Sequence, residues 1–504
     1  MNASKKWRGT RAAAAVLAGA LAALTLAMPA SAATPNLIDP DTLGSITLHK
    51  YEAPDAATGL PNNGMPIDPA NPILQDLVEL NGVTFSYTQL DYDLTENSGW
   101  TALAAYTGDP AEAPELVDGA SGSGVTGAAG IDGVVTFGNL PVGAYLIEET
   151  NYPIGVTPSA PFIITVPLTN PTNDNEWIYN VHAYPKNAIT TAEKTVEDSE
   201  DVKIGDDIEF TITADIPNAE IIDAYQIVDV LDEKLDYLST SVSLVDPDGV
   251  LADIVLVEGT HYTVVPAAAT IDGPIVTIAF TPAGLDLLEA NILFQVEAVI
   301  TTEVNEVGEI VNEATVFPNQ AAITNNTGTP TNEVITKWGG ITLLKVSSED
   351  AELLEGAKFQ VWSSQTNDFT TATQVTGIGT DLPAPSDTWT TGTNGQVVIE
   401  GLRYSNWADG AAVAPGAAGY LYYWLVEIEA PEDHELLAAP VPFTVTTPAA
   451  TTTVEVVNVP NNGGFVLPLT GGTGTTLFWA GGAMLLAGAV FLAIYSRRKS
   501  NASA

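Results

Sequence analysis

The segment Gly340-Ile341-Thr342-Leu343-Leu344-Lys345-Val346 decides the fold class. Apolar side chains recur at every second position and β-branched residues are frequent, which is typical of a strand with one buried face. Residues 208–212, IEFTI, repeat the pattern, and no long amphipathic helix competes with such segments. Turns rich in glycine, proline, asparagine and aspartate separate them, and the 504 residues include 43 glycines and 33 prolines. The sequence therefore predicts an all-β chain of tandem Ig-like β-sandwich domains.

An internal repeat sets the order of these domains. Residues 44–50, GSITLHK, match 340–345 in type, and 133–140 match 395–402. In both copies an aromatic strand that ends in an acid follows, at 145–149 and at 423–427. The interval from the preceding leucine to the glutamate is 9 residues in the first copy and 25 in the second, an insertion of 16 residues. The first and last domains are therefore related, and residues from about 190 to 335 form a third, different sandwich.

Composition excludes several classes of protein. The chain has 16 Lys plus Arg against 62 Asp plus Glu, a net charge of −46, and a chain this acidic repels nucleic-acid phosphates. The absence of cysteine excludes disulfides, thiolate metal sites and cysteine nucleophiles. The four histidines have no metal-ligand spacing, so we expect no metal and no cofactor. A turn at 246–249, DPDG, could hold calcium, although such turns more often serve only as turns.

The two ends of the chain carry export signals. Four cations precede an Ala/Leu-rich run at 12–27, and Ala30-Ser31-Ala32 follows as a cleavage site, which predicts a secretory signal peptide over 1–32. A membrane anchor is the alternative interpretation. At the other end, residues 477–495 are 19 uncharged residues followed by a basic tail, which predicts a transmembrane helix with the C-terminus inside the cell. Residues 33–470 carry all 62 acids and only nine cations, a net charge of −53.

A pentapeptide stands just before this apolar stretch: Leu467, Pro468, Leu469, Thr470 and Gly471. With the stretch and the basic tail, it resembles the cell-wall sorting signal of Gram-positive surface proteins. The resemblance implies that a sortase cysteine attacks the carbonyl between Thr470 and Gly471, and that an amine then resolves the acyl-enzyme.

We expect the chain to divide into five parts: a signal peptide (1–32), an N-terminal domain (33–188), a middle domain (189–335), a C-terminal domain (336–465) and the sorting region (466–504).

Strand alternation places charged and amide side chains on core faces. Lys345 shares a face with Ile341 and Leu343, and Lys50 shares one with Ile46 and Leu48. The same alternation buries the acids Glu427, Glu149 and Asp229 and the amides Asn458 and Asn312. Burial lowers the pKa of a lysine and raises that of a carboxyl group, so both could be uncharged near neutral pH.

A neutral amine is a nucleophile, and a protonated carboxyl group can polarise an asparagine carbonyl and shuttle protons while ammonia leaves. The product is a Lys–Asn isopeptide bond, which would replace the missing disulfides. The alternative is a buried salt bridge or a snorkelling lysine.

Two further motifs widen the resemblance to a family. Residues 427–431, EIEAP, look like the E-box of Gram-positive pilins, and residues 177–187, WIYNVHAYPKN, look like their pilin motif. Ala183 replaces the usual Val, Ile428 replaces the usual Thr, and no Gly-Tyr follows Ala430-Pro431. With both end signals, the whole chain resembles a sortase-assembled backbone (major) pilin of the SpaA type. The resemblance implies CnaB-like outer domains and a CnaA-like middle domain.

The resemblance also assigns residues. It implies a C-terminal bond from Lys345 to Asn458 promoted by Glu427, and a middle bond from Lys194 to Asn312 promoted by Asp229. Lys50 and Glu149 fit a third bond, with Asn187 as the partner. Some members of the family lack this N-terminal bond, and the sequence leaves its presence open.

Polymerisation follows from the pilin motif. A pilin sortase would acylate on Thr470 of one subunit, and the Lys186 amine of the next would attack, which gives a head-to-tail fibre. Alternation places Lys186 opposite Asn187, exposed with His182 and Tyr184; it could instead be an ordinary surface lysine. We expect as partners a pilin-specific sortase, a housekeeping sortase and peptidoglycan, identical subunits, a minor or tip pilin and an unknown host or bacterial receptor, but no nucleic acid.

The predicted function is that of a structural shaft subunit of a cell-surface pilus, wall-anchored on a Gram-positive bacterium and supporting adhesion. We do not expect an enzyme, because isopeptide formation is a single-turnover reaction. The main alternative is a monomeric cell-wall-anchored adhesin without polymerisation. A secreted carbohydrate-active protein is another class, but it would need a paired-carboxylate cleft that the sequence does not locate.

Overall fold

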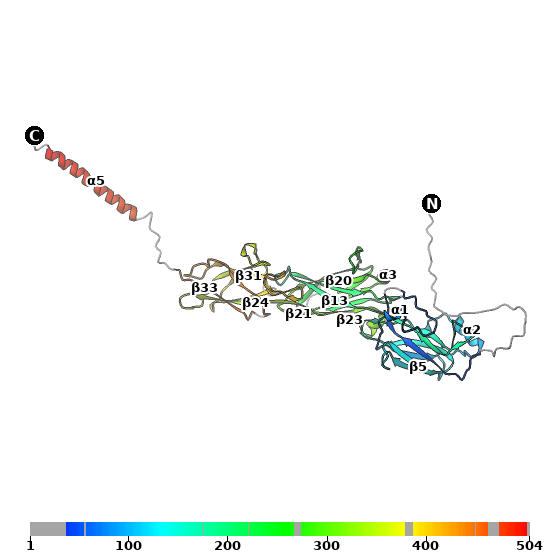
Figure 1. The fold of residues 1–504 in the computed structure, drawn as a ribbon. Coiled ribbons are helices and arrows are strands. Elements are labelled where there is room, and N and C mark those ends of the chain that lie inside the picture. The colour runs from blue at the N-terminus through cyan, green and yellow to red at the C-terminus, as the bar shows by residue number, and fades with distance from the viewer. Residues whose placement is uncertain are drawn as a thin grey trace, which may run out of the picture. The chain divides into compact units, whose positions relative to one another are not determined.

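The computed structural model describes residues 37–54, 57–173, 175–219, 221–266, 274–378, 387–448, 450–461 and 473–500. It confirms the all-β prediction, because strands dominate the described residues (Figure 1). The chain divides into two compact units. Unit 1 consists of residues 1–339, 379–381 and 401–421, and unit 2 consists of residues 340–378, 382–400 and 422–504. The signal peptide expected at 1–32 and the sorting pentapeptide at 467–471 lie outside the described residues.

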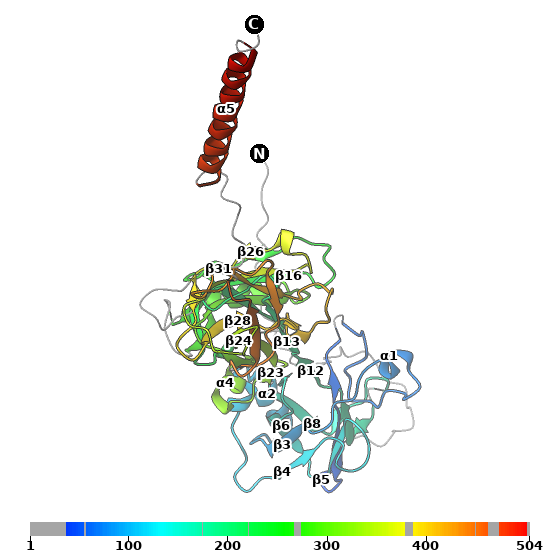
Figure 2. The same cartoon turned by 90° about the vertical axis from the view of Figure 1, so that its left-hand side faces the viewer.

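The N-terminal part of unit 1 is a sandwich built around the core cluster of Ile46, Leu48, Phe85, Tyr145 and Ile147. Its larger sheet has the order β4 (Ser121–Val125), β3 (Thr84–Gln89), β6 (Gly143–Asn151), β8 (Phe162–Val166), and Figure 2 shows these strands side by side. Two three-stranded sheets have the orders β11 (Asn180–Ala183), β1 (Gly44–His49), β5 (Val134–Leu140) and β2 (Tyr51–Glu52), β12 (Lys186–Ile189), β7 (Val156–Thr157). A short pair, β9 (Leu168–Thr169) with β10 (Trp177–Ile178), and the helices α1 (Pro72–Gln75), α2 (Asn97–Ala105) and η1 (Pro110–Glu112) complete it.

The middle part of unit 1 is a second sandwich of two five-stranded sheets. The first has the order β13 (Ala192–Glu197), β14 (Asp207–Asp215), β20 (Gln295–Val304), β16 (Leu235–Val245), β17 (Ile254–Val255). The second has the order β18 (Tyr262–Val265), β19 (Ile275–Phe280), β15 (Gln226–Val230), β22 (Ala314–Phe317), β23 (Thr329–Pro330). The helices α3 (Pro282–Ala290) and α4 (Gln320–Asn325) connect strands of this part. Alternate residues of β14 and β20 fill one continuous apolar core, as the period-two pattern predicts.

Unit 2 holds most of the C-terminal sandwich. The strand β24 (Val334–Ser347) begins in unit 1, where its residues 334–338 pair with β21 (Gly308–Asn312) of the middle part. It continues into unit 2, where it pairs in parallel with β33 (Thr453–Asn458), and β28 (Gln396–Arg403) is its other neighbour in the sheet. The opposite sheet contains β26 (Thr373–Gln374), β25 (Lys358–Ser364), β31 (Tyr422–Glu429) and β32 (Val441–Phe443), and β27 (Trp389–Thr390) pairs with β25. The helix η2 (Phe369–Thr371) follows β25.

Unit 1 also takes up the segment 401–421, which includes the hairpin β29 (Trp407–Ala408) and β30 (Ala411–Ala412). This segment contains much of the insertion seen in the second repeat. The boundary expected between residues 335 and 336 lies inside the continuous strand β24, and the domain limits stay predictions.

The last helix, α5 (Thr473–Ser500), covers the stretch at 477–495 for which we predicted a transmembrane helix. Within the described part of the chain, however, no helix is long and apolar enough to cross a membrane. The predicted span is therefore not supported.

Candidate functional site

The N-terminal sandwich brings Lys50, Glu149 and Asn187 together. Lys50 lies in the apolar stripe that continues β1, and its Nζ donates to Glu149 Oε1 and to Asn187 Oδ1, each at 2.5 Å. Asn187 Nδ2 donates to Glu149 Oε2 at 2.6 Å. The Lys50 and Glu149 side chains are 0% and 1% exposed. The carboxyl group thus contacts both nitrogens, the lysine amine through one oxygen and the asparagine amide through the other.

The C-terminal sandwich repeats this arrangement with Lys345, Glu427 and Asn458. Lys345 Nζ donates to Asn458 Oδ1, and it lies 3.7 Å from Glu427 Oε1. Asn458 Nδ2 donates to both carboxyl oxygens of Glu427 at 2.9 Å. The parallel pairing of β24 and β33 aligns Lys345 with Val456, which brings Asn458 of the same face within reach of the amine.

The middle sandwich places Lys194 of β13, Asp229 of β15 and Asn312 of β21 together, all fully buried. Lys194 Nζ donates to Asp229 Oδ2 at 2.6 Å, and Asn312 Nδ2 contacts the same oxygen at 3.4 Å. Among the described residues, Asp229 Oδ1 and Asn312 Oδ1 have no hydrogen-bond partner. If Asp229 is protonated, its carboxyl group has one hydrogen to donate, whereas the ionised group can only accept hydrogen bonds.

Burial shifts the pKa values of the three lysines and of Asp229 in the direction that the chemistry needs. It lowers the pKa of Lys50 and of Lys345 to about 8, even though Glu149 and Glu427 act in the opposite direction. Burial also lowers the pKa of Lys194 and raises that of Asp229. Each amine therefore loses its proton more easily than a solvated lysine, and Asp229 keeps its proton more readily than a solvated aspartate.

Each of these three sets of a buried lysine, acid and asparagine is called a triad below. An aromatic ring faces the lysine amine in every triad, and the sequence interpretation missed these rings. The lysine Nζ lies 5.6, 5.1 and 5.9 Å from the ring centroids of Phe85, Phe210 and Phe359. Phe85 and Phe359 occupy the same place in the two related sandwiches, since they pair with Glu149 and Glu427 beside a register shift. A longer alignment of the internal repeat would have matched these two rings.

Lys186 lies on β12 next to Asn187 but is only partly buried. We expected it to be exposed; instead, its Nζ donates to the carbonyl oxygen of Tyr184 at 3.2 Å, and burial lowers its pKa. His182 and Tyr184 are also partly buried, and the His49 ring stacks on Tyr184 with 4.6 Å between ring centroids. Lys186 thus keeps some access to solvent, while Asn187 beside it is buried.

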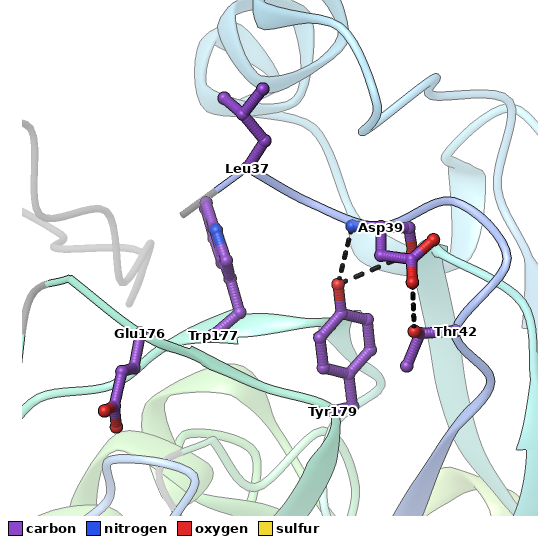
Figure 3. Close-up of a pocket in the computed structure, with 6 residues that line it drawn as sticks. All are labelled: Leu37, Asp39, Thr42, Glu176, Trp177 and Tyr179. Atoms are coloured by element: carbon purple, nitrogen blue, oxygen red, sulfur yellow. Dashed lines mark hydrogen bonds between the residues drawn. The ribbon is translucent and has the colours of Figure 1, made fainter. Parts of the chain in front are cut away.

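A pocket of about 260 Å³ opens at the start of the stretch 177–187 (Figure 3). The Tyr179 hydroxyl accepts from the backbone N–H of Asp39 at 2.9 Å, and the Thr42 hydroxyl donates to the Asp39 carboxylate. Leu37, Glu176 and Trp177 complete the lining. No triad residue lines this pocket, and the described residues contain no group of three His, Asp or Glu that could hold a metal ion.

Three segments of the chain match models of known protein families. Residues 41–188 match the family model for the N-terminal domain D1 of Gram-positive pilin subunits. Residues 339–460 match a prealbumin-like fold domain, and residues 459–502 match the LPXTG cell wall anchor motif.

Relatives match over nearly the whole chain. It is 33% identical to the fimbrial subunit type 1 of Actinomyces viscosus and 31% identical to the fimbrial subunit type 2 of Actinomyces naeslundii, over 98% of each chain. The solved structure of the full-length major pilin SpaD from Corynebacterium diphtheriae is 28% identical. It covers 85% of this chain and 99% of its own, with a TM-score of 0.63.

Proposed function

This chain belongs to the family of Gram-positive fimbrial subunits, and on that premise we propose how it is joined into a pilus and cross-linked internally. It is a structural shaft subunit of a cell-surface pilus anchored to the cell wall, in a family of structural subunits and not of enzymes. The sorting sequence at 467–471 is the substrate of a sortase. Polymerisation with other subunits requires, in addition, an acceptor amine.

Lys186 is that amine. A pilin sortase cleaves between Thr470 and Gly471 and holds Thr470 as an acyl-enzyme, which Lys186 of the next subunit attacks. The lowered pKa of Lys186 supports this assignment, because it increases the fraction of neutral, nucleophilic amine. A housekeeping sortase transfers the finished fibre to peptidoglycan, and a minor or tip pilin and a surface receptor complete the set of partners.

Each sandwich forms one isopeptide bond without an external enzyme. The lysine nitrogen attacks Cγ of the asparagine, the bond from Cγ to Nδ2 breaks, and ammonia leaves. One proton passes from the attacking nitrogen to the departing nitrogen through the carboxyl group of Glu149, Asp229 or Glu427. The observation that carries this proposal is the recurrence of the same buried Lys, acid and Asn triad in all three sandwiches.

A denaturing gel of cell-wall extract tests the intersubunit link. We expect a ladder of high-mass species from the unaltered chain and none from Lys186→Ala. Lys358→Ala is the matched control. The Lys358 side chain is 41% exposed, and its Nζ forms a surface ion pair with Glu429 Oε2 at 2.6 Å. A ladder that survives Lys186→Ala would contradict the assignment of this lysine. The absence of any ladder from the unaltered chain would favour the monomeric adhesin.

A further inference from the structure

The two glutamates of the related sandwiches each receive one more hydrogen bond from outside the triad. The Ser159 hydroxyl donates to Glu149 Oε1 at 2.5 Å, and the backbone N–H of Leu437 donates to Glu427 Oε2 at 2.8 Å. In both copies the donor stands ten residues after the glutamate. The same position of the repeat therefore supplies a further donor to the carboxyl group in both copies. In the first copy it is a side chain that donates to the oxygen that also contacts Lys50, and in the second it is a backbone N–H that donates to Oε2 and not to the Oε1 near Lys345.

The strand that carries each glutamate explains why a donor arrives at this position. Pairing of β3 with β6 and of β25 with β31 shifts register next to the Phe that faces the glutamate. Both strands end two residues after the glutamate, β6 at Asn151 and β31 at Glu429, and the chain that follows brings a donor within hydrogen-bond distance of the carboxyl group. The middle sandwich differs, because Asp229 Oδ1 has no partner among the described residues.

We propose that Ser159 and the Leu437 N–H are positioning groups for isopeptide bond formation. The inference rests on the proposed function and identifies what holds the proton-shuttling carboxyl group in place. The carboxyl plane of Glu149 must keep Oε1 toward Lys50 Nζ and Oε2 toward Asn187 Nδ2, since the proton leaves one nitrogen and arrives at the other. The Ser159 hydroxyl is a third donor to this carboxyl group and the second on Oε1; it limits rotation of the carboxyl plane, and so keeps both nitrogens in contact with the group.

The rate of bond formation in the refolding full chain tests the proposal. Samples are quenched over time, and peptide mass spectrometry follows the loss of about 17 Da at each Lys–Asn pair. We expect Ser159→Ala to slow formation of the Lys50–Asn187 bond about tenfold. Ser159→Thr, which keeps the hydroxyl, should restore the rate. The other two bonds of the same molecule are internal controls for folding.

The backbone donor is tested in the same way. Leu437→Pro removes the N–H and should slow the Lys345–Asn458 bond, whereas Leu437→Ala keeps the N–H and should not. Unchanged rates in Ser159→Ala and Leu437→Pro would overturn the positioning role, as would equal slowing in Ser159→Ala and Ser159→Thr. A complete absence of the Lys50–Asn187 bond from the unaltered chain would instead contradict the proposed function at that site.

Discussion

Glu427 is the residue whose chemistry is most open to a direct test. Glu427→Gln preserves the shape of the side chain but removes the group that accepts and returns a proton. We predict that the Lys345–Asn458 bond does not form, so the chain stays about 17 Da heavier than its cross-linked form and the C-terminal sandwich unfolds at a lower temperature. Intact mass and thermal unfolding measure both effects.

Glu429→Gln is the matched control for that substitution. Glu429 lies two residues further along β31 with its side chain 59% exposed, and it pairs with Lys358 only at the surface. Exposed ion pairs contribute little to stability, so this variant should keep the bond and nearly all of its stability. A cross-link that forms in Glu427→Gln would exclude Glu427 as the promoting acid.

The lowered pKa of Lys345 makes a prediction about pH. Burial lowers it from 10.5 to about 8, so between these values an unbonded native state binds fewer protons than the unfolded chain. Stability then rises with pH through this window, because the unfolded state holds the extra proton. Asn458→Ala prevents the bond without exposing the amine, and we predict that the unfolding temperature of this variant increases from pH 8 toward pH 10.

The double variant Asn458→Ala with Lys345→Met isolates this effect from other titrations. It lacks the amine but keeps an apolar side chain of similar length, so its unfolding temperature should rise less over the same pH range. Equal slopes for the two variants would show that Lys345 has an ordinary pKa in the folded chain.

At the scale of elements, alternation along single strands could be predicted from the sequence. The pattern of β1 and β24 was sufficient to place Lys50 and Lys345 in the core, because side-chain direction follows from period two alone. The aromatic rings and Ser159 could not be placed in the same way. Their contacts depend on register shifts and on a loop that turns back over the site, and neither leaves a periodic signal.

The sequence also did not predict which part of the fold the insertion of the second repeat would join. Residues 401–421 fold into unit 1, and Arg403, the single arginine of residues 33–470, is fully buried there. Its guanidinium group donates to four backbone carbonyl oxygens, those of Ser199, Asp201, Trp407 and Gly419. Nothing in the local sequence distinguishes such an arginine from an exposed one.

Arg403→Met should therefore destabilise unit 1. It leaves four carbonyl oxygens without these donors, and we expect a loss of about 3 kcal/mol in the free energy of unfolding, measured by chemical denaturation. Hydrogen exchange should increase in residues 198–206, which contact this segment. Lys358→Met, at an exposed ion pair, is the control and should lose less than about 1 kcal/mol. An equally small loss in Arg403→Met would mean that the carbonyl contacts do not stabilise the fold.

Over the whole molecule, half of the few lysines outside the two ends of the chain lie at or beside the proposed covalent links. Residues 33–470 contain eight lysines, of which three lie in buried triads and one, Lys186, directly precedes a triad asparagine. In the C-terminal sandwich the triad joins β24 to β33, twelve residues before Thr470. Force that enters a subunit at Lys186 or leaves it near Thr470 therefore meets a proposed covalent link close to each junction.

Peptide mass spectrometry of proteolysed fibres from the cell wall tests this account most directly. We predict branched peptides that join Lys50 to Asn187, Lys194 to Asn312 and Lys345 to Asn458. Because Lys186 and Asn187 are adjacent, the peptide that contains them should carry a further branch ending in Thr470. Linear peptides with four unmodified lysines, or a Thr470 branch on another lysine, would contradict the account.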